Sequence, residues 1–250
     1  MTRASEYDVF LTAQALAINK ARLDHLASLG LDLAGKTVLE VGAGIGLHTE
    51  FFEQRGCTVL STDGNASNVA EIKRRYPYRD ARVLDLRDSW GLSELGEFDI
   101  VYCYGTLYHL SRPDEALRAL AEVCGEMTLV ETCVALGRYP ELHLVHDYKG
   151  NNQAIHSVGC RPTRAWVMKT LRAVFGHAYI TAAQPNHSDF ETDWRLVGPL
   201  KLYRAVFVGS KQPLANELLL ETIPEVQARY EPRLARAESS RAHPESLTIA

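Results

Sequence analysis

Three closely spaced glycines and two acidic residues are the part of this sequence whose types and spacing best indicate chemistry. Gly42, Gly44 and Gly46 alternate with other residues after a short apolar run. Glu40 lies two residues before the first glycine, and Asp63 ends the next apolar run. Glycine lets a backbone turn sharply and approach a ligand because it has no Cβ, and a carboxylate can accept two hydrogen bonds from a ribose diol. The spacing therefore indicates a nucleotide-like ligand.

The elements that must position these residues are a strand, a turn, a helix and a second strand. Residues 37–41 are typical of a buried parallel strand, because they are mostly β-branched or leucine. After the turn, Leu47, Phe51 and Phe52 recur at helical intervals. We therefore expect the turn to present its ligand at the start of a helix.

The register of the glycines separates two classes of nucleotide site. A dinucleotide fingerprint reads Gly-x-Gly-x-x-Gly, whereas this turn reads EVGAGIG from Glu40 to Gly46. The turn resembles motif I of the class I S-adenosylmethionine-dependent methyltransferases, and the resemblance implies that Glu40 helps to orient the methionine end of the cofactor. A pyrophosphate would be repelled by Glu40, whereas a sulfonium and an ammonium would be attracted. The alternative is an ordinary α/β crossover whose glycines serve only the turn.

The resemblance continues along the chain. It implies that Asp85 and Leu86 read the amino group and the ring of adenine. The predicted cofactor is S-adenosylmethionine, and the predicted cofactor-binding residues are Glu40, Gly42, Ala43, Gly44, Gly46, Asp63, Gly64, Asn65, Asp85, Leu86 and Tyr104.

Strand and helix patterns alternate from residue 36 to residue 134, which predicts an α/β fold with a doubly wound, mostly parallel sheet. Strands are expected at 98–103 and 127–134 and a helix at 113–123. Ligands of such sheets bind beyond the carboxyl ends of the strands. The acidic and aromatic residues expected at these ends are Glu40, Asp63, Asp85, Tyr104 and Glu131.

The family resemblance implies a Rossmann-like methyltransferase fold with seven strands, closed by antiparallel strands at 178–182 and 203–208. The domain organisation that we predict is an N-terminal helical lid at 1–35, a methyltransferase domain at 36–210 with a substrate-cover insertion at about 135–165, and a C-terminal helix with a frayed tail at 211–250. The C-terminal helix is expected at 214–236, broken at Pro224 and Pro232.

Bulk properties narrow the class of protein. The formal charge of −4 argues against a nucleic-acid partner, which usually requires a basic surface. The sequence shows no leader at Met1 and no apolar run near 18 residues, so we expect neither export nor membrane spanning. A cytoplasmic protein is expected because its five cysteines lack a paired pattern. The cysteines are Cys57, Cys103, Cys124, Cys133 and Cys160.

Residues 218–220 are a candidate homodimer contact.

Residues after the fourth expected strand are candidates for catalysis. Methyl transfer to an alcohol or phenol is faster when a base lies within hydrogen-bond reach, and histidine titrates in the useful range. His109 is the candidate base, with a structural histidine as the alternative, and Tyr104 and Tyr108 could orient the acceptor or line the cavity around the sulfonium. Glu131, Asn151 and Asn152 are the further candidates for hydrogen bonding to a polar acceptor.

Four residues after the fifth expected strand raise the question of a metal. Magnesium prefers oxygen ligands and the spacing matches no established pattern, so no metal is predicted. The four residues are His143, His146, Asp147 and His156.

One branch of the family resembles this chain further. The segments YHLSRPDEALRALAEV, VETCV, NNQAIHSVGCRPTRAWVMKTL, HSDFETDW and YRAVFVGSKQPL resemble the catalytic domain of the tRNA wobble-uridine carboxymethyltransferases and their small-molecule relatives. The resemblance implies that Tyr108 and Arg204 bind the carboxylate of carboxy-S-adenosylmethionine. The basic N-terminal region of that family, whose lysine completes the carboxylate site, has no counterpart in residues 1–35.

We therefore predict an enzyme that transfers a plain methyl group, with O-methylation of a polar small molecule such as a glycoside or a secondary metabolite. The alternatives are a (carboxy)methyltransferase acting on tRNA or another nucleic acid, and a non-catalytic scaffold that binds the cofactor.

Overall fold

The strand order of the central sheet reverses between β1 (Thr37–Val41) and β4 (Phe98–Tyr104). The computed structural model describes residues 7–146, 157–195, 198 and 202–232. Its main sheet has the order β11-β8-β10-β5-β4-β1-β2-β3. The reversal is where α/β sheets of this type hold their ligands. The other strands are β2 (Thr58–Asp63), β3 (Asp80–Val83), β5 (Cys124–Val134), β8 (His177–Thr181), β10 (Tyr203–Ser210) and β11 (Leu219–Leu220).

Strands β1 to β5 are parallel to one another, and β10 runs antiparallel to both β5 and β8. The predicted doubly wound, mostly parallel methyltransferase-type sheet is thus confirmed. The seven expected strands are present, and the two-residue strand β11 adds an eighth at the edge beside β8. Central positions such as Val38, Ile100 and Val206 are fully buried, as expected for strands covered on both faces.

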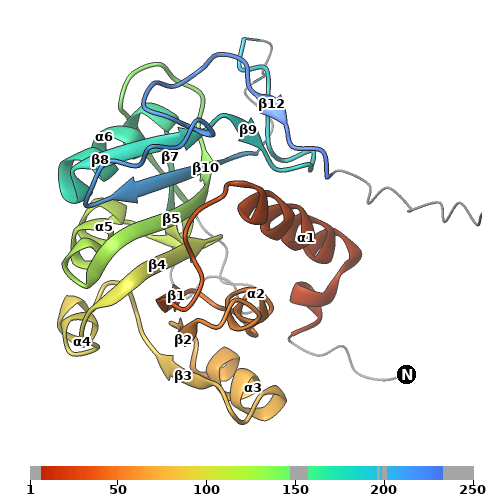
Figure 1. The fold of residues 1–250 in the computed structure, drawn as a ribbon, viewed down its shortest axis with the longest axis vertical. Coiled ribbons are helices and arrows are strands. Elements are labelled where there is room, and N and C mark those ends of the chain that lie inside the picture. The colour runs from red at the N-terminus through yellow and green to blue at the C-terminus, as the bar shows by residue number, and fades with distance from the viewer. Residues whose placement is uncertain (1–6, 147–156, 196–197, 199–201, 233–250) are drawn as a thin grey trace, which may run out of the picture.

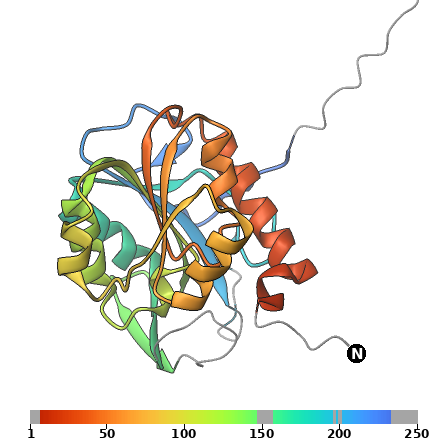
Figure 2. The ribbon, with the colours of Figure 1, turned by 90° about the horizontal axis from the view of Figure 1, so that it is seen from below.

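Helices cover both faces of the sheet (Figures 1 and 2). Helices α4 (Ser89–Ser93), α5 (Pro113–Glu122) and α6 (Arg164–Phe175) lie on one face, and α1 (Ala13–Ser28), α2 (Thr49–Glu53) and α3 (Ala66–Arg75) lie on the other. The apolar residues expected on one face of α5 include Leu117 and Leu120, and both are buried. Two short 3-10 helices are also present. The first, η1 (Asp8–Leu11), precedes α1, and the second, η2 (Leu107–His109), follows β4.

Helix α1 packs on the sheet through its apolar residues. Thr12 begins the helix by accepting a hydrogen bond from the Ala15 amide at 3.1 Å. Ile18 and Leu26 are buried in one core cluster together with Phe52 of α2. This packing brings the N-terminal segment beside the carboxyl ends of β1 and β4.

Two small strand pairs lie outside the main sheet. Strands β6 (Leu142–His146) and β7 (Val158–Pro162) pair within the segment predicted as a substrate cover, and β9 (Ala183–Gln184) pairs with β12 (Ala228–Arg229). The candidates Asn151, Asn152, Asp147 and His156 lie outside the described residues.

The predicted C-terminal helix is wrong for residues 214–232, which are extended and irregular. This segment makes several of its backbone hydrogen bonds to distant parts of the chain. The Gln227 amide donates to the Thr192 carbonyl at 2.8 Å, and the Tyr230 amide donates to the Gln184 carbonyl at 2.8 Å. Prolines within the segment remove donors that a helix needs, so the alternating charges reflect exposure and not a helix.

All five cysteines are free, and four of them are buried. Among the residues that the structure describes, no helix is both long enough and apolar enough to cross a membrane.

Candidate functional site

The glycine turn has the backbone that its sequence predicts. Gly42 and Gly44 have φ angles of 68° and 57°, a region that favours glycine. A Cβ at Gly42 would overlap the side chain of Thr106, and a Cβ at Gly44 would lie 2.9 Å from the Phe10 ring. Thr106 is fixed there because its hydroxyl donates to the Val41 carbonyl at 3.1 Å. Both glycines are therefore required by conformation and by close approach.

Asp63 holds the glycine turn against the end of β2. Its carboxylate accepts hydrogen bonds from the Gly44 amide at 2.8 Å, from the Asn65 amide at 2.8 Å and from the Asn68 side chain at 3.2 Å. Burial raises the pKa of Asp63, and these three hydrogen bonds offset part of that effect. The half-buried carboxylate also lines the cavity described below.

Glu40 is buried between β1, β2 and α2. It accepts hydrogen bonds from the Thr49 hydroxyl at 2.6 Å and from the Ser61 hydroxyl at 2.9 Å. Burial raises the pKa of Glu40 to about 7, although the two hydroxyls and the charge of Arg79 act in the opposite direction. The ionisation of Glu40 is therefore poised to respond to a nearby cation.

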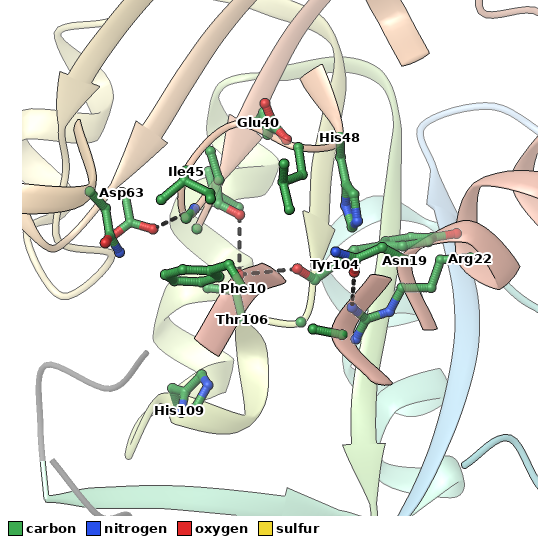
Figure 3. Close-up of a pocket in the computed structure, with 18 of the residues that line it drawn as sticks. Phe10, Asn19, Arg22, Glu40, Ile45, His48, Asp63, Tyr104, Thr106 and His109 are labelled. Atoms are coloured by element: carbon green, nitrogen blue, oxygen red, sulfur yellow. Dashed lines mark hydrogen bonds between the residues drawn. The ribbon is translucent and has the colours of Figure 1, made fainter. Parts of the chain in front are cut away.

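A cavity of about 400 Å³ opens along the carboxyl ends of β1, β2 and β4 (Figure 3). This volume is within the range of small-molecule sites. The sequence-predicted residues that line it are Glu40, Gly42, Ala43, Gly44, Asp63, Gly64, Asp85, Leu86, Tyr104, Tyr108, His109 and Arg204. Predicted cofactor and acceptor residues thus face one shared space.

Three of the predicted site residues do not line this cavity. Gly46 closes the turn, with its amide donating to the Ala43 carbonyl at 2.9 Å and its carbonyl accepting from Arg79 at 2.8 Å. Asn65 caps α3 by accepting from the Ser67 amide at 3.0 Å. The third residue, Glu131, is buried beneath the cavity. In the structure these residues make supporting contacts and do not line the cavity. Their predicted contact with a ligand stays a prediction.

Glu131 is the centre of a buried ion network. It lies 2.6 Å from Arg22 of α1 and 3.0 Å from Arg204 of β10. Burial alone would raise the pKa of Glu131, but the charges and hydrogen bonds of the two arginines hold it below its usual value. An ionised Glu131 therefore fixes two guanidinium groups that do line the cavity.

Tyr108 and His109 lie together on η2. Their rings are 4.1 Å apart between centroids, and Arg204 donates to the Tyr108 hydroxyl at 3.4 Å. The guanidinium of Arg161 lies 5.3 Å from the Tyr108 ring and donates to the Tyr108 carbonyl at 3.3 Å. Burial raises the pKa of Tyr108, with the charge of Arg204 acting against it. Tyr108 and Arg204 thus lie side by side at the cavity, and their binding of a carboxylate stays a prediction.

The sequence predictions missed several polar and aromatic residues of the cavity, including Arg22, Phe10 and His48. Arg22 and Phe10 come from the N-terminal segment, and His48 precedes α2. Arg22 lies four residues from Ile18 and from Leu26 on the buried side of α1, so a charged residue on an apolar helical face was the available signal. No comparable pattern singles out His48 or Phe10.

His143 and His146 lie on β6 and do not line the cavity. In the described part of the chain, no group of three or more histidine, cysteine, aspartate or glutamate residues is placed to hold a metal ion.

Comparisons with known proteins agree with this geometry. A family model described as "Methyltransferase domain" matches residues 39–126, which contain the glycine turn, Asp63 and Asp85. This region of the chain is therefore similar to a methyltransferase domain. The chain is also similar to ubiquinone biosynthesis O-methyltransferases from Xanthomonas oryzae pv. oryzae, with 33% identity over 111 residues, and from Dechloromonas aromatica, with 32% identity over 136 residues.

These alignments cover 43% and 51% of this chain and 46% and 55% of the respective relatives, so the chain matches about half the length of these curated proteins. Among solved structures, the N-terminal domain of EvdMO1 with S-adenosylhomocysteine bound has a TM-score of 0.61 at 21% identity, covering 81% of this chain and 84% of that one. Magnesium protoporphyrin IX methyltransferase (ChlM) from Synechocystis PCC 6803 has a TM-score of 0.54 at 14% identity, covering 85% and 86%. These structural likenesses establish the shared fold.

Proposed function

We propose that this protein uses S-adenosylmethionine to methylate an oxygen atom of a polar small molecule. The observation that carries the proposal is the single cavity that contains both the glycine turn with its acids and the group Tyr108, His109 and Arg204. A transferase needs its donor and its acceptor in one enclosed space, where reacting atoms can be aligned and water excluded.

The residues present fit the cofactor. Gly44 allows close approach to the backbone because it has no Cβ, and the Phe10 ring packs at this position. Asp63 lines the cavity and could accept hydrogen bonds from ribose hydroxyls. Asp85 and Leu86 lie at the end of β3 and line the same cavity, as adenine recognition requires. Glu40 and Asp63 supply negative charge that favours a cation. When bound, the cofactor would supply an activated methyl group.

The part of the cavity proposed to bind the methyl acceptor is polar and contains positively and negatively charged side chains. Arg204, Asp189 and His109 line it, and the ring of Tyr108 is held by Arg204. We propose that Tyr108 positions the acceptor and that His109 takes the proton of its hydroxyl as the oxygen bonds to the methyl carbon and the sulfur–carbon bond breaks. Residues 7–28 would act as the lid, since their side chains line the cavity from the N-terminal side.

The related proteins support an oxygen acceptor. The curated relatives are ubiquinone biosynthesis O-methyltransferases, and the EvdMO1 domain has been crystallised in the presence of S-adenosylhomocysteine and D-fucose. A phenol and a sugar hydroxyl are both compatible with a base placed on η2.

The test is transfer of a labelled methyl group from S-adenosylmethionine to a panel of phenols, glycosides and hydroxylated metabolites. We expect S-adenosylhomocysteine to bind in isothermal titration and at least one hydroxylated compound to become labelled. His109→Gln should lower kcat and leave the Kd for S-adenosylhomocysteine unchanged, whereas the control His143→Gln should change neither. Absence of any binding of S-adenosylhomocysteine would contradict the proposal, and binding without transfer to any acceptor would favour a non-catalytic scaffold.

The second candidate is a (carboxy)methyltransferase acting on tRNA. Nη2 of Arg204 and the hydroxyl of Tyr108 lie 3.4 Å apart, close enough to bind one carboxylate together. Bulk tRNA at low salt is therefore the second arm of the assay, because phosphate-driven binding weakens as salt rises. Competition between S-adenosylmethionine and its carboxylated form distinguishes the two donors.

A further inference from the structure

One end of the cavity contains buried polar atoms that have no hydrogen-bond partner within the described ranges. They are Nε2 of His48, Nε of Arg22 and the hydroxyl of Tyr104. All three residues line the cavity. Figure 3 draws His48 and Arg22 on one side of the pocket and Asp63 on the other, with Phe10 between them. A buried polar group without a partner is costly, so such a cluster indicates a place where a ligand supplies the missing partners.

The hydrogen bond between His48 and Tyr102 sets which ring nitrogen carries the proton. The Tyr102 hydroxyl lies 3.0 Å from Nδ1 of His48, and no other partner for this hydroxyl is found in the described residues. A tyrosine hydroxyl buried beside a single acceptor donates its proton to that acceptor. Tyr102 therefore donates to Nδ1, and the proton of the neutral imidazole lies on Nε2. His48 consequently presents an N–H donor.

His48 keeps this form over the working pH range. Burial, together with the nearby charge of Arg22, lowers the pKa of His48 to about 3. Burial also holds the pKa of Tyr102 well above its usual value, so its hydroxyl stays protonated. The donor at Nε2 is thus permanent and does not depend on a proton from solvent.

Arg22 adds positive charge at the same end. Arg22 and Arg204 together face one acid, Glu131, at 2.6 Å and 3.0 Å. The second acid of the cluster, Asp189, lies 3.8 Å from Nε of Arg204 and therefore compensates the Arg204 side. The two acids thus balance the two guanidinium groups. The remaining hydrogen bond of Arg22 goes to the neutral side chain of Asn19 at 3.0 Å, and Nε of Arg22 has no partner among the described residues. A histidine N–H donor beside a guanidinium with an unused N–H suits a carboxylate.

We propose that His48 Nε2–H and Arg22 bind the α-carboxylate of the amino-acid part of the cofactor, with the Tyr104 hydroxyl as a third donor and Tyr102 as the positioning residue for His48. The inference rests on the proposed function, because it assigns the end of the cofactor opposite to the ribose. A ligand whose ribose lies at Asp63 and which runs past Gly44 places its far end beside His48 and Arg22.

The test compares three ligands by isothermal titration. S-adenosylhomocysteine carries the carboxylate, its decarboxylated analogue keeps the amine and loses the carboxylate, and 5′-methylthioadenosine lacks both. In the unchanged protein, we expect S-adenosylhomocysteine to bind at least about tenfold more tightly than the decarboxylated analogue, as a hydrogen bond to a charged group implies. His48→Phe should remove most of this preference while leaving the affinity for the two smaller ligands unchanged.

Two further variants separate positioning from packing. Tyr102→Phe removes the hydroxyl and should reduce the preference for the carboxylate by a smaller factor, and nitrogen chemical shifts of His48 should show a mixture of tautomers in place of the Nε2–H form. His143→Phe, on an exposed strand outside the cavity, is the control and should behave as the unchanged protein. Thermal melting of each variant identifies one that fails to fold, in which case Tyr102→Phe carries the test.

The proposal is overturned if His48→Phe weakens all three ligands equally, which indicates only a change of shape, or if it weakens none of them. Unchanged binding of S-adenosylhomocysteine with impaired use of a carboxylated acceptor also overturns it, because the carboxylate then comes from the acceptor. If none of the three ligands binds to the unchanged protein, it is the proposed function that fails.

Discussion

The two sides of the cavity are built in different ways. On one side, Glu40, Gly42, Gly44 and Asp63 come from a single strand-turn-helix-strand unit of 24 residues, from 40 to 63. On the other side, Arg22, Glu131 and Arg204 come from α1, β5 and β10, and the pairs that they form are separated by 109 and 73 residues. The first, which we call the local side, depends on backbone conformation. The second, which we call the long-range side, depends on the completed fold. Their responses to mutation and to pH should differ accordingly.

The largest effect is expected where the long-range side loses its central charge. Glu131→Gln leaves the buried Arg22 without its acid and leaves Arg204 with only the more distant Asp189. Removal of one partner of a buried pair costs about 3–5 kcal/mol. Chemical denaturation should show this loss in the free energy of unfolding. Glu122→Gln, on the exposed face of α5, is the matched control and should change it by less than about 0.5 kcal/mol. A stability change at Glu131 no larger than that of the control would show that the network is not a structural unit.

A smaller loss of stability and a complete loss of ligand binding are expected on the local side. Gly42→Ala places a Cβ at a φ of 68° and against Thr106. Gly30→Ala is the matched control, since Gly30 has a φ of 61° and open space around its Cβ position. The control should cost about 1 kcal/mol for conformation alone, and Gly42→Ala about 1–3 kcal/mol more for overpacking. Equal stability of the two variants and retained binding of S-adenosylhomocysteine would contradict the role of the close approach.

Of the two buried acids Glu40 and Glu131, only Glu40 should make cofactor affinity depend on pH near 7. Buried His25 and His48, with pKa values lowered to about 4 and about 3, add a contribution to stability that is lost as pH falls below about 6.5. Glu40 has a pKa of about 7, against 4.5 for the free side chain, so the folded state without ligand holds this proton more tightly than the unfolded state. The free energy of unfolding should therefore fall as pH rises from about 4.5 to 7 through this group. Affinity for the cationic cofactor should rise over pH 6 to 8, because ionised Glu40 attracts it, by up to about tenfold per pH unit below 7.

Titration calorimetry in two buffers of different ionisation enthalpy should detect release of a proton when S-adenosylmethionine binds. Glu40→Gln should flatten the pH profile and abolish this release. A profile that keeps its slope in Glu40→Gln would assign the titration to another group. Glu131 should contribute no slope in this range, because its pKa lies below its usual value.

The smallest effect is expected for the aromatic cover of the glycine turn. Phe10→Ala removes a half-buried ring that packs over Gly44, and a partial loss of apolar contact should weaken S-adenosylhomocysteine by about three- to tenfold. Phe10→Leu should recover most of the affinity. Leu11→Ala, at an exposed neighbour on η1, serves as the control, and an effect as large as that of Phe10→Ala would mean that the ring has no specific role.

The comparison also explains what the sequence could predict. The strands, the glycine turn and Asp63 were predictable because the signal lies in neighbouring residues whose types report local backbone requirements. Glu131 was predicted to contact the acceptor, yet it pairs with Arg22 and Arg204 because β5 and β10 are adjacent and α1 covers them. No local pattern reveals such a pairing. The C-terminal helix failed for a similar reason, since residues 214–232 hydrogen bond to distant carbonyls.

The ion pair between Arg22 and Glu131 constrains how a ligand can enter. Lifting α1 as a whole would separate two buried charges, with a penalty of several kcal/mol. Thr12 is extended and separates the 3-10 helix η1 from α1. We therefore expect ligand entry and product departure to require displacement of η1, which carries Phe10, while α1 stays in place.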